Sequence, residues 1–99
     1  MYYAFICEDA VGSLGARRAH RPAHLARLQA LQDEGRLLLA GPHPALDGED
    51  PGEAGFTGSL IVAEFPSIEA AREWAAMDPF AIYGVYRNVI VKPFRKGLP

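Results

Sequence analysis

The order of apolar and turn-forming segments along the 99-residue chain narrows its possible folds more than any other feature. Short apolar runs without turn formers predict β-strands, and apolar residues that recur every three to four positions predict helices. The chain therefore alternates in the order strand, helix, strand, strand, helix, strand. The expected elements are a strand at 2–8, a helix at 22–34, strands at 36–42 and 56–65, a helix at 68–77 and a strand at 85–94.

The bounds of the two expected helices come from residues that favour helix ends. Pro22 suits the first position of a helix, where its missing N–H is not needed, and Gly35 gives a stop. Residues 9–18, which precede this helix, are expected to form a loop. Ser67 is a good N-cap for the second helix, and the Asp-Pro pair at 78–79 predicts a new turn or short helix after it.

This order is the split βαββαβ pattern of the ferredoxin-like fold. Right-handed crossovers place both helices on one face of a four-stranded antiparallel sheet. Residues 1–99 are expected to form this single α+β domain, because the chain is short and its composition is ordinary for a globular protein. Apolar side chains alternate onto both faces of the expected strands. The face without helices is therefore expected to pack on the same face of a second copy, giving a sheet-to-sheet homodimer or a larger assembly built from it.

Composition argues against several classes of partner. A formal net charge of −2 offers no broad basic surface for nucleic acid. No segment is long and apolar enough to cross a bilayer, and the first residues lack the basic start of a signal peptide, so a cytoplasmic protein without membrane attachment is expected. The single cysteine, Cys7, is expected to be a small buried strand residue. No metal site is expected from His20 and His24, because Pro22 starts the predicted helix after His20.

Two polar residues fall on the inward faces of the expected helices. At about 100° per residue, His24 lies on the same side of its helix as Leu28 and Leu31. Continuing the apolar periodicity of residues 68–77 brings Asp78 onto the inward face at the end of the second helix. The topology puts the start of the first helix and the end of the second at one end of the molecule. His24 and Asp78 are therefore expected to be neighbours.

A pocket is expected at this end of the molecule, with distinct roles for its side chains. Asp78 would orient the imidazole of His24, which would act as general acid or base. Arg21, just before His24, could hold a substrate carboxylate, and Ser59 could donate from its hydroxyl. Structural interpretations of both residues stay open. Water could satisfy the hydrogen bonds of His24, and Asp78 could simply cap the turn that follows it. The other residues expected to contact substrate are Gly41, Pro42 and Phe80.

Four stretches together resemble the YciI-like (YCII-related) family: "RPAHLARLQALQDEGRLLLAGP", "GFTGS", "SIEAAREWAAMDPF" and "VYRNVIVKPF". The resemblance covers nearly the whole chain. It implies a ferredoxin-like dimer of the α+β barrel type with an active site centred on a histidine and an aspartate. The histidine of "RPAHL" falls on His24, and the aspartate of "DPF" falls on Asp78. The family is also similar in fold to muconolactone isomerases and to a chloromuconolactone dehalogenase.

The function expected from these residues is that of a small enzyme that needs no cofactor. It would transfer a proton on a small, carboxylated organic molecule, in an isomerisation, an elimination or a dehalogenation. An alternative is a binding or regulatory module that senses a small molecule in the same pocket. A structural dimer without a ligand is a third hypothesis.

Overall fold

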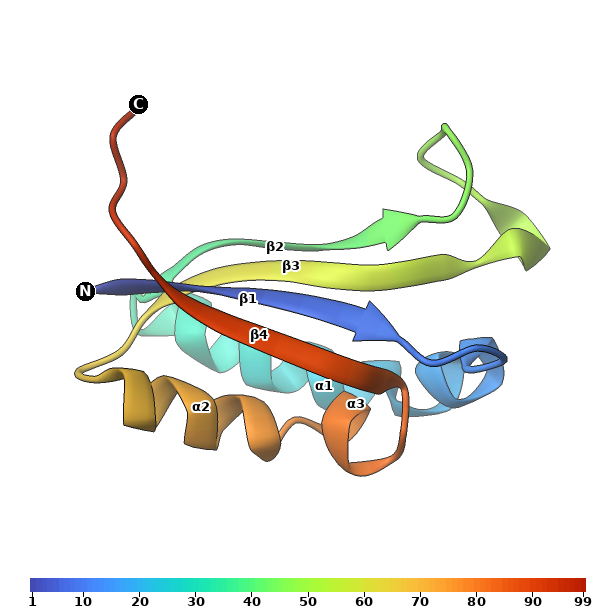
Figure 1. Ribbon diagram of the computed structural model, residues 1–99, viewed down its shortest axis with the longest axis horizontal. Helices are drawn as coiled ribbons and strands as arrows, with labels where there is room; N and C mark the ends of the chain where they lie inside the picture. The colour runs from blue at the N-terminus through green and yellow to red at the C-terminus, as the bar shows by residue number, and fades with distance from the viewer.

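Four antiparallel strands form the sheet, in the order β2-β3-β1-β4, and the helices cover one of its faces (Figure 1). The computed structural model describes residues 1–99. The predicted order of elements and the ferredoxin-like α+β fold are confirmed. The elements are β1 (Tyr2–Asp9), α1 (Leu14–Asp33), β2 (Leu37–Pro44), the short helix η1 (Gly52–Ala54), β3 (Phe56–Glu64), α2 (Ile68–Ala76), α3 (Pro79–Ile82) and β4 (Tyr86–Phe94).

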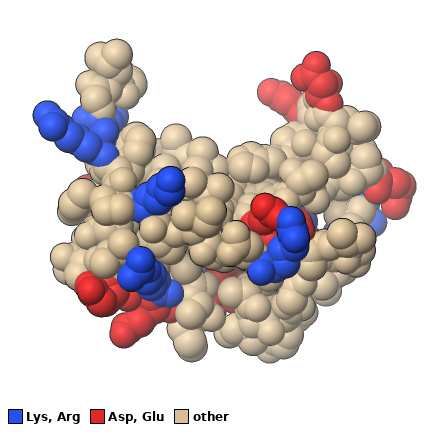
Figure 2. Space-filling view, in the orientation of Figure 1, with Lys and Arg blue, Asp and Glu red and all other residues tan.

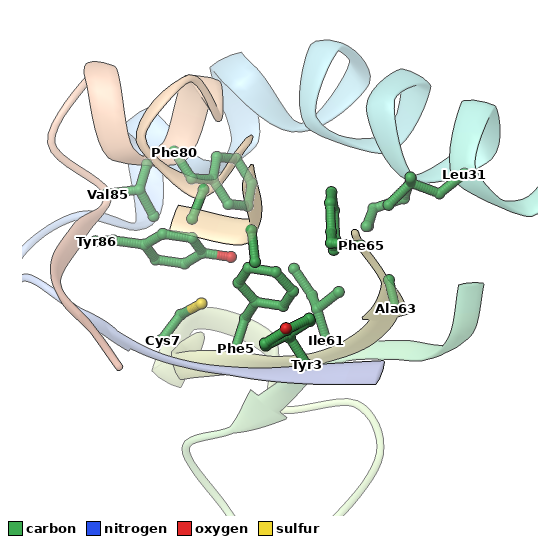
Figure 3. Packing of buried hydrophobic residues seen from close by; sticks show 13 residues of the cluster. Tyr3, Phe5, Cys7, Leu31, Ile61, Ala63, Phe65, Phe80, Val85 and Tyr86 are labelled. Carbon is green, nitrogen blue, oxygen red and sulfur yellow. The ribbon is translucent and has the colours of Figure 1, made fainter. Parts of the chain in front are cut away.

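The first strand, β1, lies inside the sheet because it pairs with both β3 and β4. Phe5 is opposite Ile61 of β3 and Val91 of β4. β2 extends the sheet on the other side of β3, where Gly41 is opposite Leu60. Successive side chains of a strand face opposite sides of the sheet. The buried side chains of β1 that face the helices are those of Tyr3, Phe5 and Cys7 (Figure 3).

Aromatic side chains fill much of the space between the sheet and the helices (Figure 3). The ring of Phe5 packs edge-on against Phe65 and Trp74, with centroid distances of 5.6 and 5.2 Å. Phe5 and Phe80 are almost completely buried. Burying a phenylalanine side chain contributes about 1.5–3 kcal/mol. This packing holds α2 and α3 against the sheet and so fixes the position of the residues between them.

The first helix begins at Leu14, about two turns before the predicted start at Pro22. The predicted loop at 9–18 is therefore wrong over its second half. Gly12, with a φ of 74°, turns the chain from β1 into the helix. A proline inside a helix costs about 3 kcal/mol, because it removes one backbone hydrogen bond and crowds the preceding turn. The added turns bury Arg17 in a hydrogen-bond network with β1 and β3.

The remaining boundaries lie close to their predicted positions. β2 continues through Pro44 instead of ending at Pro42, and the long connection after it contains η1. The Asp-Pro pair at 78–79 starts α3, as its sequence indicates. None of the helices combines the length and the apolar character that a membrane span requires.

The face of the sheet opposite the helices is uncovered in the single chain and carries several exposed apolar side chains. Ile6, Leu39 and Ile90 on this face are 39, 45 and 42% exposed. Ile6 is opposite Ile90 across the pairing of β1 with β4, so these two side chains lie side by side. Figure 1 shows that the β2–β3 connection and the C-terminal segment both project on this side, at opposite ends of the sheet.

Candidate active site

His24 and Asp78 are in direct contact, as the topology predicts. Nδ1 of His24 lies 2.9 Å from each carboxylate oxygen of Asp78. The two residues are only 6 and 2% exposed. A carboxylate beside Nδ1 favours a proton on that nitrogen. This tautomer leaves Nε2 as the ring nitrogen that can accept a proton from a bound molecule.

Two aromatic rings fix the plane of the His24 imidazole. Phe80 stacks on it with a centroid distance of 4.0 Å and an interplanar angle of 8°. Tyr86 packs edge-on, 6.4 Å away and at 87°. Together with the hydrogen bond from Nδ1, these contacts hold the imidazole in one orientation. A general acid or base requires this kind of positioning.

Asp78 reaches His24 from the junction between α2 and α3. Its Oδ1 also accepts a hydrogen bond of 2.9 Å from the N–H of Phe80 and so caps α3. One carboxylate therefore both caps the short helix and contacts the histidine. The sequence predicts a capping position for Asp78 and also its proximity to His24, and these two predictions are compatible. The cap contact keeps the carboxylate from rotating away from His24.

Arg27 lies behind the carboxylate of Asp78. Its Nη1 is 3.8 Å from Oδ2 of Asp78, and its Nη2 donates a 2.7 Å hydrogen bond to the carbonyl of Trp74. The guanidinium also lies over the Trp74 ring, 4.5 Å from its centroid. Burial lowers the pKa of Arg27, and the charge of Asp78 acts in the opposite direction.

A cavity of about 330 Å³ opens beside His24. Its volume is at the small end of the range for ligand pockets. Asp78 does not line this cavity but lies behind the imidazole, in the core. Of the site residues predicted from the sequence, those that line it are Arg21, His24, Gly41, Pro42, Ser59 and Phe80.

Arg17 is a buried arginine of this site that the sequence analysis missed. It is 6% exposed, lines the cavity and forms a bidentate ion pair with Asp9, with nitrogen-oxygen distances of 2.9 and 3.1 Å. Its Nη2 also donates to the hydroxyl of Ser59 at 2.9 Å. The interval of seven residues between Arg17 and His24 spans almost two helical turns and puts both on the buried side of α1. A helix that starts at Pro22 does not include Arg17, so its periodicity gives no information about that residue.

Arg21 and His20 occupy more open positions on α1. Arg21 is exposed but lines the cavity, and it makes no ion pair. His20 shares the helix with His24, contrary to the prediction, and it stacks on Tyr83 at a centroid distance of 4.0 Å. No group of three histidine, cysteine, aspartate or glutamate side chains is arranged to hold a metal ion.

Two further titratable groups lie in the core near the site. Burial raises the pKa of the Cys7 thiol to about 12. Burial also raises the pKa of the Tyr86 phenol above its usual value, and the nearby side chain of Ser59 acts in the opposite direction. Both groups stay protonated at neutral pH, so neither provides an anionic nucleophile there. His24 is thus the side chain best placed to exchange protons with the cavity.

The fold and the buried histidine-aspartate contact define a small ferredoxin-like α+β protein with a polar site at one end of its helical layer. Residues 1–95 match the YCII-related domain, and the chain belongs to this family. It is 59% identical over 96 residues to Protein YciI of Escherichia coli O6:H1, covering 97% of this chain and 98% of the relative. It is 55% identical over 96 residues to an uncharacterized protein of Haemophilus influenzae, with the same coverage.

A solved structure similar to this chain is that of TftG, the 5-chloro-2-hydroxyhydroquinone dehydrochlorinase of Burkholderia phenoliruptrix AC1100. The two chains share 28% sequence identity and superpose with a TM-score of 0.85, over 98% of this chain and 96% of TftG. That structure is a complex with 2,5-dihydroxybenzoquinone. A protein similar to this chain over nearly its whole length therefore binds and transforms a small oxygenated ring.

Proposed function

We propose that the chain is a cytoplasmic enzyme that transfers a proton on a small, carboxylated or otherwise anionic organic molecule. His24 is the general acid or base, and Asp78 orients it. The observation that carries this proposal is the buried contact between Nδ1 of His24 and the Asp78 carboxylate beside a cavity of suitable size. The similarity to the dehydrochlorinase TftG supports it.

The reaction requires only one proton acceptor and one stabilising carboxylate. Nε2 of His24 takes a proton from a carbon next to a carbonyl, and the electron pair of the broken C–H bond moves into the substrate. Return of the proton to another carbon gives an isomerisation. Departure of a leaving group with its electron pair gives an elimination. Asp78 stabilises the imidazolium that forms in either case, and proton transfer by an imidazole needs no cofactor.

Ligand identification followed by a turnover assay tests this function. We expect small molecules that co-purify with the chain to be identifiable by mass spectrometry. Each is then incubated with the protein in D₂O, alongside 5-chloro-2-hydroxyhydroquinone, the compound named for TftG. The expected result is deuterium uptake at carbon, isomerisation or chloride release for at least one compound. Tight binding without any turnover would instead support the regulatory module.

We also propose that two copies pack through the open face of the sheet. The apolar side chains of Ile6, Leu39 and Ile90 would be covered in such a dimer. Charge at the two ends of this face supports the arrangement. Figure 2 shows acidic residues at the end with the β2–β3 connection and basic residues at the C-terminal end. A two-fold axis that exchanges these ends places opposite charges against each other. The residues concerned are Asp47, Glu49 and Asp50 at one end and Lys92, Arg95 and Lys96 at the other.

Sedimentation equilibrium measures this association. We expect a dimer at micromolar concentration, and we expect Ile6→Lys combined with Ile90→Lys to raise its dissociation constant by about 100-fold or more, because four ammonium groups would meet in an apolar interface. Ile82→Lys, on the exposed side of α3, is the matched control and should leave the dimer intact. A wild-type protein that sediments as a monomer would refute the proposed dimer.

A further inference from the structure

Four hydrogen bonds hold the side chain of Arg17 in place. Its Nε and Nη2 bind both carboxylate oxygens of Asp9, and Nη2 also donates to the carbonyl of Gly58 and the hydroxyl of Ser59. The side chains of Arg17 and Asp9 are only 7 and 4% exposed. The guanidinium therefore has a fixed position and cannot swing out into solvent.

One edge of this guanidinium stays free. Nη1 of Arg17 makes no hydrogen bond, but it is not among the fully buried polar atoms without partners, so it retains contact with solvent. Arg17 lines the cavity beside His24. Because Nε and Nη2 are occupied by protein acceptors, Nη1 is the nitrogen of Arg17 that is left to donate to a molecule bound there. An arginine that is rigid on one side and open on the other is suited to binding an oxyanion.

Phe80 brings Arg17 and His24 to the same part of the cavity. The centre of the Arg17 guanidinium lies 4.9 Å from the centroid of the Phe80 ring, and the His24 imidazole stacks on that ring at 4.0 Å. Apolar side chains, including Leu28 and Ile61, complete the wall. The cavity therefore combines a proton acceptor, a hydrogen-bond donor with positive charge, and an apolar surface for the body of a ligand.

The charges around the cavity also favour an anion. Asp9 balances the charge of Arg17, and Asp78 is paired with His24 and lies near Arg27. Arg21 remains as a cation without an acidic partner among the residues that line the cavity. An incoming oxyanion would balance this charge while accepting hydrogen bonds from Arg17.

We infer that the cavity binds its molecule as an oxyanion, a carboxylate or an enolate, whose charged oxygen accepts hydrogen bonds from Nη1 of Arg17. This inference rests on the proposed function and specifies its substrate class: a small anion with a flat apolar body. It also reassigns the principal anion contact from Arg21, as the sequence suggested, to Arg17. Arg21 then contributes long-range attraction from the exposed end of the cavity.

A matched pair of probes, benzoate and benzamide, tests the anion site because the two differ only in replacing a carboxylate by a neutral amide. We expect benzoate to bind more tightly to the wild-type protein, measured by NMR titration of the ¹⁵N-labelled chain. Arg17→Gln should reduce the affinity for benzoate by about tenfold or more and leave that for benzamide nearly unchanged. Arg18→Gln removes the same charge from an exposed position on α1 and should change neither affinity.

The Arg17→Gln variant could fail to fold because it leaves the buried carboxylate of Asp9 without a partner, and a second variant covers that case. Asp9→Asn combined with Arg17→Gln removes both charges, so no buried carboxylate is left without a partner. This double variant should show the same loss of preference for benzoate. Equal binding of benzoate and benzamide to the wild-type protein, or an unchanged preference in a folded variant, would overturn the inference.

The benzoate preference and the turnover of His24→Ala together test the anion site and the proposed function separately. His24→Ala should retain the preference for benzoate, because that preference depends on Arg17. If the preference is absent while His24→Ala still abolishes turnover, the anion site is refuted and the enzymatic function stands. If the preference is present while His24→Ala leaves turnover intact, the role of His24 is refuted and the anion site stands.

Discussion

His24→Ala is expected to lower kcat by about 10²- to 10⁴-fold, the usual contribution of a positioned general acid or base. The fold should persist. The imidazole borders a cavity that already reaches solvent, so its removal enlarges that cavity and does not leave a closed void in the core. Asp78 would keep its hydrogen bond from the N–H of Phe80 and its proximity to Arg27. The melting temperature, measured by circular dichroism, should fall by no more than a few degrees.

Two control variants make this result specific. His20→Ala removes an imidazole one turn earlier on α1, where it stacks on Tyr83 away from Asp78, and it should leave kcat unchanged. Asp78→Asn should lower kcat as well, because an amide no longer stabilises the imidazolium. A protein that unfolds when His24 is replaced would show that the histidine is structural. A folded variant with full activity would show that another group transfers the proton.

The meeting of His24 and Asp78 was predictable because it depends on periodicity and topology. The spacing of His24 from Leu28 and Leu31 puts it on the buried side of α1 wherever that helix begins. Asp78 was assigned to the right place by extending the period of α2, although that helix ends at Ala76 and Asp78 instead caps α3. Both the extended period of α2 and the cap of α3 put the carboxylate at the same end of the sheet.

The role of Arg17 could not be reached in the same way. Pro22 is a strong signal for a helix start, which leaves Arg17 in the loop predicted before it, and arginine is usually exposed in proteins. The ion pair of Arg17 with Asp9, at the end of β1, acts against both of these tendencies. Only the packing of α1 against the sheet shows that this carboxylate accepts a bidentate ion pair. Local propensity rules contain no information about such a tertiary contact.

Gly58→Ala is expected to be the most destabilising single substitution among the residues around the site. A Cβ added at Gly58 would lie 2.0 Å from the carbonyl oxygen of Cys7 and 3.1 Å from its carbonyl carbon. Gly58 of β3 is opposite Glu8 of β1, so the clash falls within the central strand pair. Rigid backbone atoms on both sides leave no flexible side chain to move aside. We expect the free energy of unfolding to fall by about 3 kcal/mol or more.

Urea denaturation followed by circular dichroism measures this loss, with Gly15→Ala as the matched control. Gly15 lies inside α1 and has no atom within 4 Å of an added Cβ, so alanine there should stabilise the protein by about 0.5–1 kcal/mol. The carbonyl of Gly58 also accepts a hydrogen bond from Nη2 of Arg17. Separation of β1 from β3 would therefore displace Arg17 as well. Any folded fraction of Gly58→Ala should bind benzoate less well than the wild-type protein, whereas unchanged stability and binding would mean that the strands can separate here without cost.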